Sequence, residues 1–317
     1  MKELPLVSII IPCRNEENFI EKCLDSILEQ DYPREKVEVF VVDGLSQDKT
    51  RKIVEEYSNK YSFIRLLTNP NKFTPFALNI GIKNSVGEVI VRLDAHSFYP
   101  KNYVSNCVKY LFQYNADNVG GIWKIMPKEN TLINKAIVFA SGSYFGGGNA
   151  YYRTGKIENA KEVDTVFGGC YKREVFNTVG LYNENLKRSQ DMEFNIRLKK
   201  AGGKIVLVPE IFSYYYPKSD LASFLKHNFE DGIWAVYPLK FVKIPFKLRH
   251  YIPLIFFLTL PLSLWPYIPA SLFFSWKIAK KEKDVKLFFA MPVVFFVRHF
   301  AYGAGSFFGI IKLLIGK

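Results

Sequence analysis

Short apolar runs alternate with segments of helical period through the first third of the chain. Residues 6–12 form a β-branched run that ends at Pro12, and residues 16–29 then carry apolar side chains three and four positions apart. The alternation continues with predicted strands at 37–42, 64–67 and 88–93, and with predicted helices at 48–57 and 75–84. Strands that alternate with helices in this way are typical of a parallel, doubly wound α/β sheet.

The residues directly after the predicted strands are polar or acidic. In doubly wound sheets, ligands bind beyond the carboxyl ends of the strands, so the chemistry is expected there. On a strand end, residues i and i+2 point to one side, which predicts that Asp94 and His96 face the same site. The positions concerned are Arg14, Asn15 and Glu16 after the first strand, Asp43 and Gly44 after the second, and Asp94, Ala95 and His96 after the fourth.

The middle of the chain carries weaker periodicity. Between residues 117 and 176 the glycine-rich stretch 142–148 and the pair Gly168 and Gly169 predict flexible loops around a ligand site, with 142–148 as a candidate lid. A clear helical pattern returns at 191–201, where the glycines at 202 and 203 supply a C-terminal cap.

The last quarter of the chain has the pattern of a membrane-associated region. Residues 251–276 contain no charge, a length that suffices to cross a bilayer, but four prolines interrupt them and basic residues flank both ends. A re-entrant or interfacial hairpin bent near residues 261–269 therefore fits better than a single span. In the last apolar run, 287–315, Arg298 and His299 require a polar partner, and a lipid phosphate is one such partner. Buried helices of an accessory domain are the alternative.

Charge is distributed unevenly along the chain. Of the net charge of +13, residues 240–317 supply most, with twelve Lys or Arg against two acidic residues. Because this excess flanks apolar runs, anionic lipid headgroups fit it better than nucleic acid does. The four cysteines have no metal-like or disulfide spacing, and no secretory signal is recognisable in residues 1–20. We therefore expect a catalytic domain at residues 1–238 on the cytoplasmic side of the cell membrane, and a membrane-associated helical region at 239–317.

Five motifs together resemble glycosyltransferase family 2, whose catalytic domain has the GT-A fold. The exopolysaccharide, succinoglycan-type branch is the most similar, and the resemblance covers about residues 5–238. The motifs are VSIIIPCRNEE at 7–17, VVDGLSQDKT at 41–50, RLDAH at 92–96, DTVFGGCYKREVF at 164–176 and QDMEFNIRLKKAG at 190–202. The resemblance implies a nucleotide-sugar-binding α/β domain of the Rossmann-like, doubly wound type.

The resemblance also implies a nucleotide site and a metal site. Asp94 and His96 take the place of the family's Asp-x-Asp pair and would hold Mg²⁺ or Mn²⁺ against the diphosphate; the histidine is a departure from the usual second acid. From the residues alone, Asp43 can also be interpreted as a turn carboxylate, and Glu16 as an acid in the first turn of a helix. The expected nucleotide-binding residues are Pro12, Arg14, Asn15, Glu16, Asp43, Arg92 and Asp94.

The expected general base is Asp191. A carboxylate at a helix start can deprotonate the acceptor hydroxyl, and Asp191 matches the family's acidic pair, with Gln190 in place of the first acid. An N-cap without a catalytic role is the alternative, and Glu193 is either a second site acid or an ordinary first-turn acid. The expected sugar- or acceptor-binding residues are Gly168, Gly169, Gln190 and Trp234.

The sequence thus predicts an inverting, non-processive hexosyltransferase. The expected donor is a nucleotide sugar, with uridine as the base, and the expected acceptor is a polyprenyl-linked or other glycan precursor; a Gln-x-x-Arg-Trp signature of processive enzymes is missing near Trp234. Two alternatives remain: a membrane-bound protein that binds nucleotide sugar or carbohydrate through a degenerate site, and a sugar nucleotidyltransferase. The latter would be expected to show a glycine-rich basic loop after the first strand, where this chain has residues 12–16.

Overall fold

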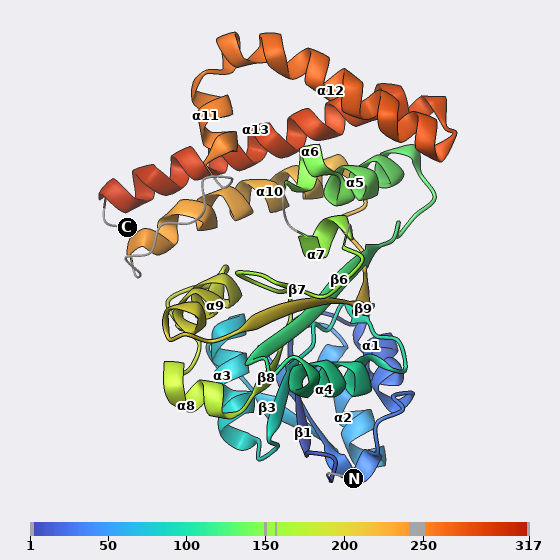
Figure 1. Cartoon of the computed structure of the whole chain (residues 1–317), viewed down its shortest axis with the longest axis vertical. Helices are drawn as coiled ribbons and strands as arrows, with labels where there is room; N and C mark the ends of the chain where they lie inside the picture. Colours follow the sequence, from blue (N-terminus) through green and yellow to red (C-terminus); the bar gives the residue numbers. More distant parts are fainter. Residues whose placement is uncertain (1–2, 149–150, 156, 241–250, 316–317) are drawn as a thin grey trace. The chain divides into compact units, whose positions relative to one another are not determined.

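The computed structural model describes residues 3–148, 151–155, 157–240 and 251–315 (Figure 1). The chain divides into two compact units. The first consists of Met1–Lys124 and Lys156–Tyr215, and the second of Ile125–Gly155 and Tyr216–Lys317. The second unit therefore takes in residues 125–155 from the middle of the chain. The division at residue 238 stays a prediction.

The described part of the first unit is built on a nine-stranded sheet in the order β3-β2-β1-β4-β8-β6-β9-β5, with β7 paired to β9. The first four strands in sequence pair in parallel, and β4 then pairs with β8 antiparallel. The parallel, doubly wound sheet is therefore confirmed, and an antiparallel extension follows it. The bounds are β1 Val7–Cys13, β2 Val37–Asp43, β3 Ile64–Thr68, β4 Val89–Arg92, β5 Ser97–Phe98, β6 Asn118–Ile125, β7 Lys161–Glu162, β8 Cys170–Lys172 and β9 Ile205–Tyr215.

Helices cover both faces of the parallel strands. Ile9 and Ile11 of β1 belong to a core that includes Ile20 of α1 and Val104 of α4. On the opposite face, a Cβ at Gly81 of α3 would lie 2.4 Å from Ile10, so the helix packs directly on the strand. The helices of this unit are α1 Ile20–Leu28, α2 Thr50–Lys60, α3 Thr74–Asn84, α4 Tyr103–Gln113, α8 Glu174–Val179 and α9 Gln190–Lys200. Strands buried on both sides explain why the sequence shows continuous apolar runs there.

The second unit is helical in its described residues and is organised around α13. This helix packs against α5, α10, α11 and α12. Ala136 of α5, Phe224 of α10 and Phe295 of α13 share its hydrophobic core. The helices are α5 Leu132–Gly142, α6 Tyr144–Gly147, α7 Tyr151–Thr154, α10 Leu221–Val236, α11 Ile252–Leu258, α12 Leu260–Glu282 and α13 Val285–Ile315. The flexible loop expected at 142–148 is wrong for residues 144–147, which form the helical turn α6.

Glycines allow the helices of this unit to approach closely. A Cβ at Gly305 would lie 2.0 Å from the carbonyl oxygen of Phe229, and one at Gly232 would lie 2.0 Å from that of Tyr302. A Cβ at Gly303 would lie 2.1 Å from the carbonyl oxygen of Pro253. Because a side chain at any of these positions would collide with backbone, α13 is fitted to α10 on one side and to α11 on another.

The apolar region 251–276 contains a single chain break, at Thr259 between α11 and α12. Pro261 lies in the first turn of α12, where a missing N–H removes no helical hydrogen bond. Pro266 and Pro269 lie inside α12 without ending it. The bend expected near residues 261–269 is therefore wrong, because α12 is continuous there and the helix break lies just before Pro261. A hairpin that enters the membrane stays a prediction.

Protein groups partner the two polar residues in the middle of α13. The ring nitrogens of His299 lie 2.9 Å from the hydroxyl of Tyr267 and 3.0 Å from the carbonyl oxygen of Phe145. The Arg298 guanidinium lies 3.4 Å from the hydroxyl of Ser141. Among the described helices, only α13 is both long and apolar enough to cross a membrane, by length and composition alone.

Candidate functional site

Hydrogen bonds from backbone N–H groups to side chains connect the segments that follow β1 and β2. The Asn15 N–H donates to the hydroxyl of Ser46, and the Gln47 N–H donates to the side-chain oxygen of Asn15. The Glu16 N–H donates to the hydroxyl of Thr50 at 2.7 Å. Asn15 and Leu45 both have positive φ, at 56° and 57°. Such strain persists only where the surroundings enforce it, which is common at binding sites.

Asp43 is buried in its turn. Its carboxylate is fully shielded from solvent, accepts from the Ser46 hydroxyl at 2.5 Å, and lies 3.6 Å from the Arg51 guanidinium. These contacts correspond to the turn carboxylate that the sequence left open as an alternative. Pro12 lies half-buried at the end of β1, and Arg14 is exposed in the loop that follows. The strand-end loops thus bring the predicted nucleotide-binding residues together along one edge of the sheet.

Glu16 and His96 come together from two different loops. The Nδ1 atom of His96 lies 3.4 Å from Oε1 of Glu16, and both side chains are partly open to solvent. The backbone of Asp94 is held by Tyr99, whose hydroxyl lies 2.7 Å from the Asp94 N–H and 3.3 Å from its carbonyl oxygen. Burial raises the pKa of Tyr99 well above its usual range, so this hydroxyl stays neutral.

A divalent ion at this site would have few protein ligands. In the described part of the chain, no group of three or more His, Cys, Asp or Glu side chains is placed to hold a metal. The carboxylate of Asp94 and the imidazole of His96 are the types of ligand that suit Mn²⁺. An ion held by only these two side chains is typical of sites that complete the coordination shell with substrate phosphate and water.

Arg92 links Asp94 to Asp191. Its guanidinium is 94% buried at the end of β4, with Nη2 3.2 Å from Oδ1 of Asp94 and Nη1 3.9 Å from Oδ2 of Asp191. Burial alone would lower the pKa of Arg92, but these two carboxylates hold it above its usual range. The candidate metal ligand and the candidate base therefore both lie next to one permanent positive charge.

Asp191 enters the site at the start of α9. Ser189, just before the helix, has a φ of 60°, and the Asp191 carboxylate accepts from the N–H of Met192. Gln190 is buried, and its side-chain oxygen has no hydrogen-bond partner among the described residues. Glu193 points elsewhere: its buried carboxylate pairs with Arg197 through two contacts, at 2.6 and 3.0 Å. Of the two interpretations of Glu193, the structure favours the ordinary helix acid.

Gly168 and Gly169 form the turn that leads into β8. Their φ values are 71° and 98°, which favour glycine. A Cβ at Gly168 would lie 3.2 Å from the carbonyl oxygen of Arg92, and one at Gly169 would lie 2.6 Å from the Tyr171 ring. The glycines therefore bring this turn against the end of β4, next to Arg92.

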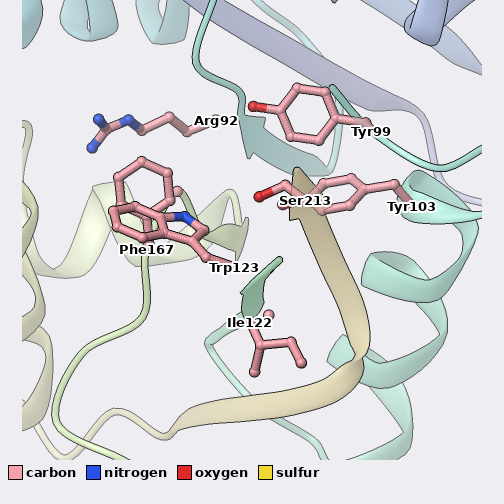
Figure 2. Close-up of a pocket in the computed structure, with 9 residues that line it drawn as sticks. Arg92, Tyr99, Tyr103, Ile122, Trp123, Phe167 and Ser213 are labelled. Carbon is pink, nitrogen blue, oxygen red and sulfur yellow. The ribbon is translucent and has the colours of Figure 1, made fainter. Parts of the chain in front are cut away.

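A small pocket opens beside Arg92 (Figure 2). It encloses about 260 Å³, counted to its open mouth, and combines the buried cation with aromatic walls. Trp123 meets Phe167 edge-on at 4.3 Å and stacks on Tyr215 at 4.2 Å. The lining residues are Arg92, Tyr99, Tyr103, Gly121, Ile122, Trp123, Phe167, Gly168 and Ser213.

The sequence analysis missed most of this pocket. Trp123 on β6 and Ser213 on β9 come from strands that carry no recognisable motif, and only Phe167, next to the glycine pair, had a nearby signal. Trp234 lies in α10 of the second unit, where its ring meets Tyr237 edge-on at 5.5 Å. Its contact with a sugar stays a prediction.

Comparison with known proteins identifies relatives over the whole chain. Residues 8–180 match the model of glycosyl transferase family 2. A dolichyl N-acetyl-α-D-glucosaminyl phosphate 3-β-D-2,3-diacetamido-2,3-dideoxy-β-D-glucuronosyltransferase of Methanococcus voltae is 31% identical over 96% of this chain and 97% of its own length. The succinoglycan biosynthesis protein ExoA of Rhizobium meliloti is 28% identical over 75% of this chain and 76% of its own.

Solved structures share the fold. The mannosyltransferase PcManGT from Pyrobaculum calidifontis, in complex with GDP-Man and Mn²⁺, superposes with a TM-score of 0.65 at 21% identity, over 100% of this chain and 89% of its own. Residues 1–349 of TarS from S. aureus, in complex with UDP-GlcNAc, give a TM-score of 0.52 at 16% identity, over 98% and 92%. The predicted GT-A fold is confirmed. With a doubly wound sheet, acidic side chains at its carboxyl edge and a family match over more than half its length, the chain belongs to glycosyltransferase family 2.

Proposed function

We propose that this nucleotide-sugar-dependent transferase works by inversion, adds one sugar at a time, and uses a UDP sugar and a lipid-linked acceptor. The observation that carries the proposal is the contact of both Asp94 and Asp191 with the guanidinium of Arg92. A transferase that inverts needs donor phosphate and acceptor base at one site, on opposite sides of the reacting carbon. No described protein carboxylate other than Asp191 shares Arg92 with Asp94.

In this proposal the strand-end loops bind the nucleotide. The loops of β1 and β2 place Pro12, Arg14, Asn15 and Glu16 along one edge, while Asp43 is buried in the turn after β2. Two relatives of the same fold are described with GDP-Man or UDP-GlcNAc bound, and we extend nucleoside diphosphate sugars as donors to this chain. Asp94 and His96 would hold Mg²⁺ or Mn²⁺, which neutralises charge on the departing diphosphate.

Asp191 then takes the acceptor proton. The acceptor oxygen forms a bond to the anomeric carbon while the bond from that carbon to the phosphate oxygen breaks, and the nucleoside diphosphate leaves with the bonding electrons. The hydroxyl proton passes to the Asp191 carboxylate. Gly168 and Gly169 would let the acceptor or donor sugar approach the backbone, and Gln190 and Trp234 are proposed as further sugar contacts.

We further propose a lipid-linked acceptor at the cytoplasmic face of the membrane. The relative from Methanococcus voltae is named for a dolichyl phosphate-linked acceptor and for a transferred sugar that is a hexuronic acid. In the second unit, Leu262 and Trp265 of α12 and Phe289 of α13 are 75%, 82% and 70% exposed. Five lysines lie where α12 ends and α13 begins, and lysines beside exposed apolar side chains favour anionic lipid headgroups.

The transferase activity is tested by nucleotide release. Purified full-length protein in detergent is given UDP sugars, Mn²⁺ and a polyprenyl diphosphate-linked monosaccharide, and UDP is measured with and without the acceptor. Acceptor-dependent release of UDP and a product one sugar longer are expected. Products of many added sugars would contradict the non-processive mechanism, and UDP binding without any release would favour a binding protein.

Replacing His96 by Ala is expected to raise the Mn²⁺ concentration needed for half-maximal activity about 10-fold or more. The variant removes one of only two proposed protein ligands while leaving Asp94 in place. Activity is titrated against Mn²⁺ at saturating donor, and Mn²⁺ binding is measured directly by its paramagnetic resonance signal. His227→Ala is the matched control, because His227 pairs with Asp231 on α10 in the second unit. An unchanged Mn²⁺ requirement would remove His96 from the metal site.

Replacing both Leu262 and Trp265 by Ser is expected to lower binding to vesicles at least 10-fold. Leu262 and Trp265 are 75% and 82% exposed. Burial of such a side chain in the lipid contributes roughly 1.5–3 kcal/mol to the free energy of binding. Flotation with vesicles containing anionic lipid measures the effect. Phe112→Ser is the control, because Phe112 is a 51% exposed apolar residue on α4 of the first unit. Equal flotation of both variants would contradict the assigned surface.

A further inference from the structure

The buried guanidinium of Arg92 has hydrogen-bonding capacity that the protein does not use. Among the described residues, its Nε and Nη1 atoms have no hydrogen-bond partner, and the contact of Nη1 with Asp191 is long, at 3.9 Å. An arginine 94% removed from water normally has its N–H groups satisfied, because unpaired polar groups in such a place are costly. The unused donors therefore indicate a ligand group with oxygen acceptors.

The position of Arg92 along the sheet indicates which part of the donor would meet it. Asp43 ends β2, Asp94 follows β4, and the pocket beside Arg92 is formed with β6 and β9, on the side of β4 away from β1 and β2. A donor with its nucleoside near β2 and its diphosphate at Asp94 would extend its sugar toward this pocket. Arg92 therefore lies on the sugar side of the diphosphate.

The pocket is suited to one substituent of a sugar ring. It leaves about 10 Å³ for the centre of a water-sized group, which is room for a single small group and not for a whole sugar ring. Phe167 lies under the guanidinium, with Cζ 5.7 Å from the ring centre (Figure 2). Ser213 adds a hydroxyl to the lining of the pocket. A planar cation with aromatic walls is the arrangement that proteins use to bind carboxylates.

We propose that Arg92 binds the carboxylate of the transferred sugar, so that the donor is a nucleotide-linked hexuronate rather than a neutral hexose. This inference rests on the proposed function, because it assumes a nucleotide-sugar donor at Asp94. Asp94 and Asp191 already supply counter-charge, at 3.2 and 3.9 Å, but neither accepts a hydrogen bond from Nε or Nη1. A sugar carboxylate offers two oxygen acceptors to these donors, whereas a neutral hydroxymethyl group offers one.

The wild-type protein tests this with matched donors. UDP-glucuronate and UDP-galacturonate are compared with UDP-glucose and UDP-galactose, which differ only by a carboxylate in place of a hydroxymethyl group. At least one acidic sugar is expected to bind 10-fold or more tightly than its neutral counterpart, measured by competition against a fluorescent UDP analogue. If the neutral sugar binds equally or better in both pairs, the inference is overturned.

Variants then separate the carboxylate from the diphosphate. Arg92→Gln is expected to remove the preference for the acidic sugar, about 10- to 100-fold, and to leave binding of UDP itself within about threefold; Arg92→Lys is expected to restore part of the preference. Arg34→Gln, at an exposed arginine outside the pocket, is the control. If Arg92→Gln weakens UDP and all donors alike, Arg92 serves the diphosphate and the inference fails, while the proposed function stands. If UDP and every UDP sugar fail to bind the wild-type protein, the proposed function fails first.

Discussion

Asp191→Asn is expected to lower kcat by about 10²–10⁴-fold and to leave binding of UDP within twofold. The amide keeps the shape of the side chain and its place on α9, but it cannot accept the proton of the acceptor hydroxyl, and general base catalysis is worth about that factor. Initial rates of acceptor-dependent UDP release measure kcat, and calorimetric titration measures UDP binding. The selective loss of kcat is what separates a base from a residue that binds the donor.

Glu174→Gln is the matched control for this change. Glu174 also lies in the first turn of a helix, α8, but its side chain is 71% exposed. The kcat of the Glu174→Gln variant is expected to equal that of the wild type. Asp191 would be only a helix-end residue if Asp191→Asn kept more than about a tenth of the wild-type kcat. The midpoint of thermal unfolding, measured for each variant, ensures that a lost activity reflects chemistry and not an unfolded protein.

Glu193→Ala is expected to destabilise the first unit by about 3 kcal/mol, with a fall of about 6–12 °C in the midpoint of thermal unfolding. The Glu193 side chain is 3% exposed and forms a two-point pair with Arg197. Arg197 also donates to the carbonyl oxygens of Val179 and Leu181. Loss of the Glu193 carboxylate would therefore disturb the segment between α8 and α9. The expected loss of unfolding free energy lies at the lower end of the range for buried ion pairs, because Arg197 is about a quarter exposed.

Glu162→Gln, on β7, is the control for an ion pair to the same helix. Glu162 pairs with Lys199 of α9, but both side chains are open to solvent, and such pairs contribute little. Its unfolding midpoint is expected to match that of the wild type. A Glu193→Gln variant that unfolds normally and loses its kcat would show instead that Glu193 acts in the chemistry.

The parallel half of the sheet could be predicted because its signals are local. Strands such as Val37–Asp43 are buried at every position, so apolar residues dominate them, with Glu38 as the interior exception, and the helices between them have a clear period. The acidic residues after these strands could be placed by the same reasoning, since the carboxyl ends of parallel strands share one edge. Asp94 was placed in this way, whereas Asp191 was expected from its position at a helix start. Both contact Arg92, and their roles in one site stay predictions.

The antiparallel half could not be predicted in the same way. β8 has only three residues, and β6 contains two glycines, because a Cβ at Gly121 would lie 1.8 Å from the carbonyl oxygen of Ile211. Because close strand packing requires glycine here, the sequence lacks the alternation of apolar residues that would have identified a strand. Trp123 and Ser213 reach the pocket through these strands, so neither could be assigned from the sequence. The role of Glu193 had a usable signal, an arginine four residues later on the same helix face.

The second unit is held together by contacts between residues that lie far apart in the sequence. Residues 125–155 have no composition that joins them to 216–317, yet Ala136 and Ala140 of α5 share a core with Phe295 of α13. The break before α12 falls at Thr259 because a proline is tolerated in the first turn of a helix. Position within the helix, rather than the presence of proline, decided where the chain bends.

The glycine contacts of α13 set it apart from an ordinary lipid anchor. A segment that only holds a protein at a membrane can be exchanged for any other apolar helix of equal length. α13 cannot be exchanged in this way, because Gly303 and Gly305 accept the backbones of α11 and α10 at distances that exclude any side chain. Neighbouring helices therefore constrain its sequence, so its residues can vary freely only at exposed positions such as Phe289 and Val293.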